Sequence, residues 1–161
     1  MLERKNDESV RWVFVGSGVM RPQLQQFIAD HRVTNVIMQP YQPGSGLSEL
    51  IALGEARLVL MAGGFEGTLL PSRFYGVMTA ARPTLLIGEE RSEVAFVIDD
   101  LQCGYSLRNG DGSGLVAAIK QLQREPDVAM AMGPRGRRAL EERCPMQRGG
   151  VPCGASAYAS A

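Results

Sequence analysis

The chain has 161 residues, of which 45% are hydrophobic, a size that suits one domain with a single core rather than two full domains. Lysine plus arginine and aspartate plus glutamate each number 17, so the formal net charge is +0 and non-specific binding to nucleic acid is disfavoured. No run approaches the roughly 20 apolar residues of a transmembrane segment, and the N-terminus is too charged for a signal peptide, so we expect a cytoplasmic protein that meets a membrane only through a partner.

Apolar runs of strand length alternate along the chain with segments of helical period, which is typical of an α/β fold with a parallel sheet flanked by helices. The predicted strands are 11–15, 35–39, 56–61, 84–87 and 104–107, and the run at 56–61 is apolar enough for a buried strand. A first helix is predicted after Gly18, and it runs to about Asp30. Apolar residues at helical spacing indicate four more: Leu47, Leu50 and Ile51; Phe74, Val77 and Met78; Val94, Val97, Ile98 and Leu101; Leu115, Ala118, Ile119 and Leu122.

Composition divides the chain into three segments. Residues 1–9 form a polar stub, and residues 10–143 carry the repeated strand and helix pattern of a Rossmann-like domain. Residues 144–161 lose all periodicity, and Arg148 is their one charged residue. We predict that this tail is disordered, with a short docked extension as the alternative.

Cysteine and histidine are too sparse for several kinds of site. Cys103, Cys144 and Cys153 form no Cys-x-x-Cys pair, which disfavours a disulfide framework and a zinc site. His31 is the one histidine, and no Gly-x-Ser-x-Gly elbow is present, so a hydrolytic triad is also disfavoured. We therefore predict reduced thiols, a surface position for His31 and no metal ion.

The first candidate site is the turn that contains Gly16 and Gly18. Open parallel sheets bind ligands at the carboxyl ends of their strands, so the loops after the predicted strands are the places to inspect. This turn leaves a strand and enters a helix, where backbone N–H groups and the helix dipole favour an anion. Arg21 stands where a dinucleotide fingerprint has its third glycine, so a tight strand-to-helix connection is an equal alternative.

A stronger candidate is the glycine-rich loop Gly63-Gly64-Phe65-Glu66-Gly67, which precedes Pro71-Ser72-Arg73. The loop leads into a predicted helix whose first turn offers a hydroxyl and a guanidinium. Several donors and a cation suit a diphosphate better than they suit acid or base catalysis. Arg73 could instead be a solvated residue, although a cation near a helix N-terminus is disfavoured unless it meets an anion.

A third candidate is the turn at residues 39–43, which contains Tyr41 between two prolines. Its aromatic and amide groups could stack on a planar base or form hydrogen bonds with it. A rigid connector explains the same residues equally well.

Residues 71–83, PSRFYGVMTAARP, resemble the P-S-K-x-Y-G/E-x-x-A-A-G-R-P signature of GT-B glycosyltransferases of the family-four type. The order of other motifs agrees with this family. Residues 14–18 are similar to its F-V-G-x-G, and residues 35–43 to its N-V-x-F-x-x-Y-x-P. Cys103-Gly104 followed by Asp111 resembles the family's late C-G … D stretch. Residues 132–137 are similar to its closing helix.

The resemblance implies the donor-binding C-terminal half of a GT-B fold. Such a half binds a nucleotide-diphosphate sugar, usually a UDP-sugar, as substrate for polysaccharide or glycoconjugate synthesis, without a further cofactor. At the matching positions, Ser72 and Arg73 would hold the diphosphate. The loop that contains Gly64, Glu66 and Gly67 would approach the phosphate and the sugar. Tyr41 would contact the base.

Two positions depart from the family pattern. Arg73 replaces the commoner lysine, which keeps the charge but changes the shape of the donor. Gly76 stands where many members have a ribose-binding glutamate, and Glu93 is a candidate substitute for the ribose hydroxyls. No residue is assigned a catalytic role.

The resemblance implies that the chain begins inside the donor domain, so we expect it to lack the first strand and helix of that domain and the whole acceptor domain. We therefore expect no sugar transfer by the chain alone, and we expect a separately encoded acceptor domain or self-association. Without that strand, the strand at 12–15 either pairs with 58–61 or leaves an edge that recruits another chain. A truncated, inactive nucleotide-binding domain is the alternative function, whereas a dinucleotide-dependent epimerase is disfavoured because no Tyr-x-x-x-Lys pair occurs.

Overall fold

A computed structural model of the chain describes residues 7–40, 54–61 and 72–143. The chain divides into two compact units, Met1–Leu53 and Gly54–Ala161. The helix indicated by Leu47, Leu50 and Ile51, and the tail 144–161, lie outside the described residues. No helix in the described part of the chain is long and apolar enough to cross a membrane.

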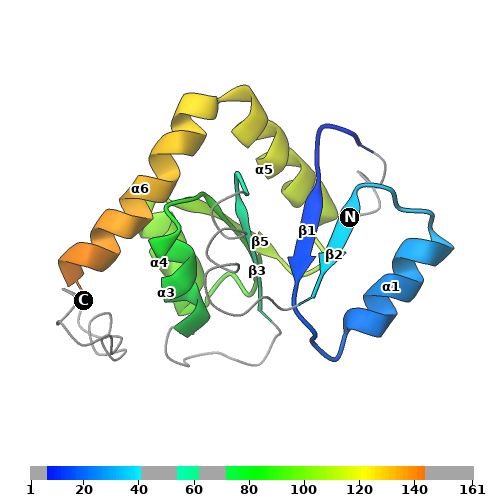
Figure 1. The fold of residues 1–161 in the computed structure, drawn as a ribbon. Coiled ribbons are helices and arrows are strands. Elements are labelled where there is room, and N and C mark those ends of the chain that lie inside the picture. The colour runs from blue at the N-terminus through cyan, green and yellow to red at the C-terminus, as the bar shows by residue number, and fades with distance from the viewer. Residues whose placement is uncertain (1–6, 41–53, 62–71, 144–161) are drawn as a thin grey trace. The chain divides into compact units, whose positions relative to one another are not determined.

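The first unit contains a parallel pair of strands and one helix (Figure 1). Strand β1 spans Trp12–Val15, helix α1 spans Arg21–Asp30, and strand β2 spans Val36–Gln39. The two strands pair from Trp12 opposite Val36 to Val15 opposite Gln39. Side chains alternate along β1, so that Trp12 and Phe14 are half-buried while Val13 and Val15 are exposed.

A buried asparagine fixes the entry into this unit. The Nδ2 of Asn35 donates to the carbonyl oxygens of Val10, at 2.9 Å, and Asp7, at 3.2 Å. Asp7 itself accepts hydrogen bonds from the backbone N–H and the hydroxyl of Ser9. The end of the stub predicted from composition therefore forms a turn that is joined to the start of β2.

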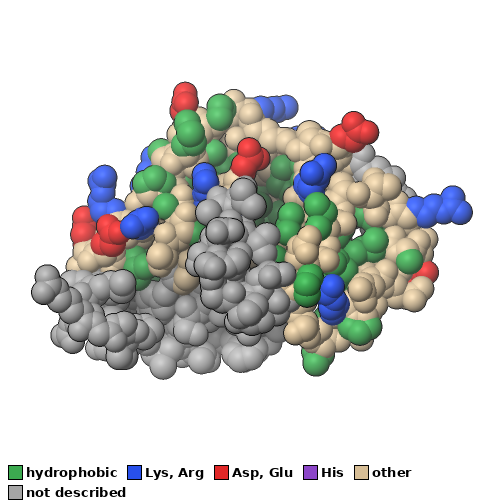
Figure 2. Space-filling model, in the orientation of Figure 1, with side chains coloured by type: hydrophobic (Ala, Val, Ile, Leu, Met, Phe, Trp, Pro, Cys, Tyr) green, Lys and Arg blue, Asp and Glu red, His purple; other side chains and the backbone are tan. Residues whose placement is uncertain are grey.

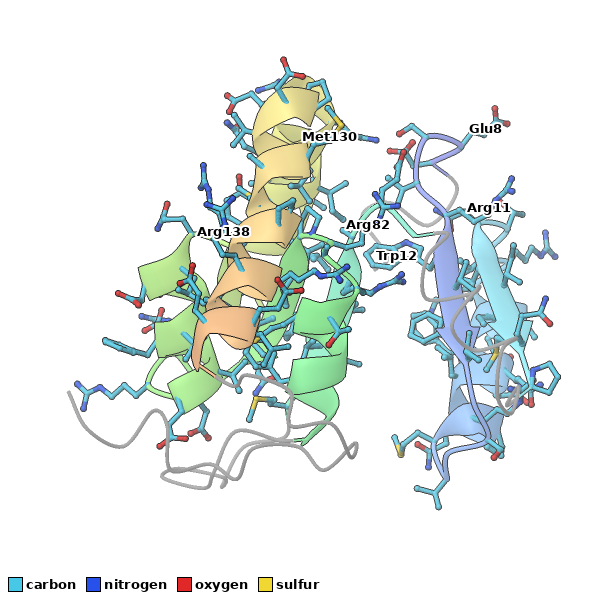
Figure 3. The ribbon with its side chains drawn as sticks, turned by 60° about the vertical axis from the view of Figure 1, so that its left-hand side comes forward. Glu8, Arg11, Trp12, Arg82, Met130 and Arg138 are labelled. Carbon is cyan, nitrogen blue, oxygen red and sulfur yellow. The ribbon has the colours of Figure 1, made fainter. Side chains whose placement is uncertain are left out.

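The second unit contains a three-stranded parallel sheet with the order β3-β4-β5. The strands are β3 (Arg57–Leu60), β4 (Thr84–Gly88) and β5 (Gly104–Arg108). The helices are α3 (Ser72–Thr79), α4 (Glu93–Leu101), α5 (Gly112–Arg124) and α6 (Pro126–Arg143). Helix α6, which carries Met130 and Arg138, packs against α3, α4 and α5 (Figure 3).

The core of the second unit lies where α3 and α4 meet the central strand. Leu86 of β4 is completely buried, as is Ile98 of α4, and Phe74 of α3 is 1% exposed. The remaining members of this cluster are Met78, Val94, Ala95, Val97 and Cys103, with Leu140 of α6 packed against it. The helical spacing of apolar residues at 74–78 and 94–98 therefore predicted the core correctly.

The strands and helices predicted within the described residues are confirmed with small shifts of their ends, but one detail differs. The strand predicted as buried at 56–61 is half-buried, and Leu60 is 63% exposed, because β3 is an edge strand of its sheet. Within the units, β1 pairs with β2 and β3 pairs with β4. A pairing of 12–15 with 58–61 would join the two units, and it stays a prediction.

The contact of α6 with the turn after α3 requires a glycine. A Cβ atom added to Gly133 would lie 2.0 Å from the carbonyl oxygen of Ala81, whereas a Cβ on Gly76 of α3 would meet no described atom within 4 Å. We expect Gly133→Ala to destabilise the protein by about 1–3 kcal/mol through overpacking. Gly76→Ala should stabilise it by up to about 1 kcal/mol through helix propensity. Urea unfolding of both variants checks this, and equal effects of the two substitutions would contradict it.

Candidate functional site at the carboxyl edge of the sheet

The second unit gathers its loops at one edge of the sheet. All three strands run parallel, so their last residues, Leu60, Gly88 and Arg108, end at the same side. The connections to α3, α4 and α5 leave from these ends. This carboxyl edge is where open parallel sheets bind their ligands.

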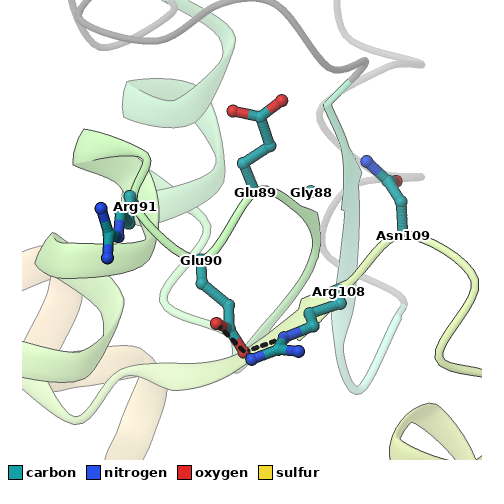
Figure 4. A pocket seen from close by; sticks show the side chains of 6 residues that line it. All are labelled: Gly88, Glu89, Glu90, Arg91, Arg108 and Asn109. Atoms are coloured by element: carbon teal, nitrogen blue, oxygen red, sulfur yellow. Dashed lines mark hydrogen bonds and ion pairs between the residues drawn. The ribbon is translucent and has the colours of Figure 1, made fainter.

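An open pocket of about 360 Å³ lies between the ends of β4 and β5 (Figure 4). We call it the β4–β5 pocket, and its lining residues are Gly88, Glu89, Glu90, Arg91, Arg108 and Asn109. Glu90 and Arg108 form an ion pair with two parallel hydrogen bonds. Nη2 of Arg108 lies 2.7 Å from Oε2 of Glu90, and its Nε donates to Oε1.

The ion pair fixes the charge state of both partners. The hydrogen bond from Arg108 is the main reason that the pKa of Glu90 lies below its ordinary value. The same hydrogen bond raises the pKa of Arg108. Both side chains are charged at neutral pH, but they are mostly exposed, so the pair orients the loop before α4 more than it stabilises the fold.

Close packing of strand ends positions the chain that enters the glycine-rich loop. The backbone N–H of Met61 donates to the carbonyl of Ile87 at 2.9 Å. A Cβ on Gly88 would lie only 3.1 Å from the Cβ of Met61, so glycine permits this approach. Nδ2 of Asn109 lies 3.5 Å from the carbonyl oxygen of Met61 and links the end of β5 to the end of β3.

Glu93 lies in the first turn of α4 and is exposed. The preceding Ser92 caps this helix, because its hydroxyl accepts a hydrogen bond from the backbone N–H of Ala95 at 3.2 Å. An acidic residue in the first turn also interacts favourably with the helix dipole. Glu93 therefore has a structural role, and its contact with ribose stays a prediction.

Arg21 occupies the corresponding edge of the first unit. Its Nη1 donates to the carbonyl oxygens of Gly16, at 2.5 Å, and Gln39, at 2.9 Å, which joins the ends of β1 and β2. Gly16 has a φ of +135°, a conformation that favours glycine, and its N–H donates to Gln39. These contacts support the tight strand-to-helix connection that the sequence left as one alternative for Gly16 and Gly18.

The sequence-predicted residues fall into three groups. Ser72 and Arg73 begin α3, so they share the carboxyl edge of the second unit with Glu93. Gly16 and Gly18 belong to the first unit. The remaining candidates, Tyr41, Gly64, Glu66 and Gly67, lie outside the described residues.

Sequence reasoning missed the side chains of the β4–β5 pocket, namely Glu89, Glu90, Arg108 and Asn109. A signal was present, because these residues lie within three positions after the predicted strands 84–87 and 104–107. The rule that ligands bind at carboxyl ends points to these loops. It does not show which of their polar side chains meet.

The described residues contain no group of three or more His, Cys, Asp or Glu side chains that could hold a metal ion. His31 is exposed, as predicted, and its ring stacks on Phe27 with 4.2 Å between the ring centres. On the face drawn in Figure 2, acidic and basic side chains are interspersed rather than gathered by sign.

Cys103 is a free thiol, 2% exposed, and burial raises its pKa to about 11. Because the folded pKa exceeds the ordinary value of 9.0, the unfolded chain loses this proton first, and stability should fall as the pH rises from about 9 to about 11.

In a Cys144→Ser/Cys153→Ser variant, we expect maleimide to label Cys103 at pH 7.5 at least ~100-fold more slowly in buffer than in urea. Equal rates would show that the thiol is accessible.

No protein-family model and no curated protein matches the sequence. Solved structures do match the fold, among them the crystal structure of WaaG, a glycosyltransferase involved in lipopolysaccharide biosynthesis. It superposes with a TM-score of 0.62 and 19% sequence identity over 80% of this chain. This chain spans 33% of the length of that glycosyltransferase. The likeness shows the fold: an α/β, Rossmann-like arrangement of the kind found in the C-terminal half of a GT-B glycosyltransferase, as the sequence predicted.

Proposed function

We propose that the chain is the donor-binding part of a glycosyltransferase and binds a UDP-sugar for polysaccharide or glycoconjugate synthesis. The observation that carries this proposal is the likeness of its fold to a solved glycosyltransferase. The signature at residues 71–83 supports it, because those residues include α3, which begins at the carboxyl edge of the sheet, and then lead into β4.

In this proposal the start of α3 holds the diphosphate. The first backbone N–H groups of a helix lack partners within the helix and carry partial positive charge, which favours a phosphate. Ser72 and Arg73 occupy these first positions. Their hydroxyl and guanidinium would add charge-assisted hydrogen bonds, and the Arg73 fork suits bidentate contact with phosphate oxygens.

Transfer of the sugar requires an acceptor held in line with the donor, together with a group that receives the proton of the attacking hydroxyl. In the GT-B glycosyltransferases that the sequence resembles, those groups come from an acceptor domain. We propose that this chain supplies donor binding and that the acceptor groups are supplied elsewhere.

Isothermal titration calorimetry of the purified chain tests this function. UDP-glucose, GDP-glucose, ADP-glucose and free UDP are titrated separately. We expect saturable binding with UDP-glucose the tightest of the three sugar nucleotides. Absence of binding by every nucleotide would favour the truncated, inactive domain, and preference for a guanosine or adenosine nucleotide would overturn the uridine assignment.

A further inference from the structure

The amino edge of the second unit carries a cation that the proposed function does not use. Arg57 is the first residue of β3, so it lies at the end of the strand opposite the carboxyl edge. Two positions further, Val59 packs against the core cluster. Because side chains alternate along a strand, Arg57 is on the same face of the sheet as Val59. Arg57 is therefore half-buried on the face that carries the core.

Two nitrogen atoms of this guanidinium have no hydrogen-bond partner in the described part of the chain. They are Nε and Nη2 of Arg57, and both are buried. Together they form one side of the planar fork, which can donate two parallel hydrogen bonds to a single oxyanion. Glu55 is the nearest acidic residue in the sequence, but it is exposed and does not pair with these two atoms. Arg57 therefore holds an unused bidentate donor.

A second arginine adds positive charge at the same place. Arg82 precedes Pro83, whose carbonyl oxygen accepts a hydrogen bond from the backbone N–H of Arg57 at 2.7 Å. Arg82 is exposed in the turn between α3 and β4 (Figure 3). Burial and, to a smaller extent, the charge of Arg82 lower the pKa of Arg57. Since a guanidinium keeps its charge in a protein, Arg57 is a partly desolvated cation beside another cation, and an anion would stabilise it.

We propose that the amino edge of β3 and β4 binds a phosphate group, with Nε and Nη2 of Arg57 as the bidentate donor and Arg82 as the second positive charge. A doubly charged phosphate suits two cations better than a singly charged carboxylate does. Because the two nitrogen atoms are buried, the Arg57 side chain turns outward toward the exposed Arg82 when the phosphate binds. This site goes beyond the proposed function, because the diphosphate of the donor is assigned to the start of α3, at the opposite edge of the sheet.

Thermal unfolding of the chain in about 50 mM sodium phosphate, and in sodium chloride of the same ionic strength, tests this inference. We expect phosphate to raise the Tm by roughly 3–5 °C relative to chloride, because it binds the folded chain alone. Arg57→Met removes the charge and keeps a long apolar side chain, so it should abolish this rise. Arg82→Gln should reduce the rise, and Arg138→Gln, the matched control on an exposed arginine of α6, should retain it.

Arg57→Met has a second expected effect, which also shows that the variant folds. In chloride it should unfold at a higher temperature than the wild type, because it removes a buried charge that has no partner. In phosphate the difference should shrink or vanish. Methyl phosphate distinguishes two sources of the ligand. If it stabilises the wild type as inorganic phosphate does, the site accepts the phosphate group of a larger molecule, and if it does not, the site binds the free ion.

Two results would overturn the inference: no rise in the Tm of the wild type in phosphate, or an equal rise in the wild type and Arg57→Met. Arg73→Ala separates this site from the proposed donor site. If the phosphate effect is retained in Arg73→Ala and lost in Arg57→Met, the phosphate binds at the amino edge, whatever the outcome of the nucleotide titrations. If the effect is lost in Arg73→Ala and retained in Arg57→Met, the phosphate binds at the start of α3, which refutes this inference and supports the proposed function.

Discussion

Replacing Arg73 with alanine should weaken the binding of UDP-glucose by about 1.5–3 kcal/mol, the usual range for a hydrogen bond to a charged group. The position is in the first turn of α3, at the carboxyl edge of the sheet. Loss of the guanidinium removes both the cation and the bidentate donor for the diphosphate. Calorimetry gives the change directly as a roughly 10- to 150-fold rise in Kd.

Two further variants show whether this effect is specific. Arg73→Lys, which restores the charge and the commoner family residue, should recover most of the affinity. Arg138→Ala removes an exposed arginine of α6 and should leave the Kd unchanged. If Arg73→Ala binds UDP-glucose with wild-type affinity, the assignment of the diphosphate to this position is wrong.

Leu86→Ala should destabilise the second unit by about 2–5 kcal/mol, a large part of the stability of an ordinary domain. Leu86 is completely buried in the central strand β4, within the cluster that includes Phe74, Val94 and Ile98. Truncation removes buried methyl groups and leaves a cavity among the side chains of this cluster, which a packed core fills only in part.

The matched control is Leu60→Ala, which removes the same atoms from a side chain that is 63% exposed on the edge strand. We expect it to change stability by about 0.5 kcal/mol or less. Urea unfolding followed by circular dichroism measures both variants. Similar losses for Leu86→Ala and Leu60→Ala would contradict the placement of the core.

The sequence predicted those features that depend on short stretches of chain. Val94, Val97 and Ile98 recur at helical spacing within one segment, and their burial follows from that spacing alone. The burial of a strand depends on its place in the sheet, which a local pattern does not contain. For this reason the apolar run at 56–61 gave no sign that β3 would be an edge strand with Leu60 exposed.

The candidate site shows the same division. The loops after the strands could be identified as ligand-binding positions because carboxyl ends of parallel strands share an edge. The pairing of Glu90 with Arg108 could not be predicted, since it depends on the register that places Gly88 opposite Arg108. Likewise, Arg21 reaches two carbonyls only because Val15 lies opposite Gln39 in the pair β1–β2.

The central claim is that a nucleotide sugar binds at the carboxyl ends of the parallel strands. A ¹⁵N–¹H NMR titration of the chain with UDP-glucose tests it most directly. The account predicts saturable shifts of the backbone amides of Arg73, Gly88 and Asn109, which lie at the carboxyl edge of the second unit, with little change at Thr84 and Gly104 at the opposite ends of β4 and β5. Shifts confined to Thr84 and Gly104, or no shifts at saturating UDP-glucose, would contradict it.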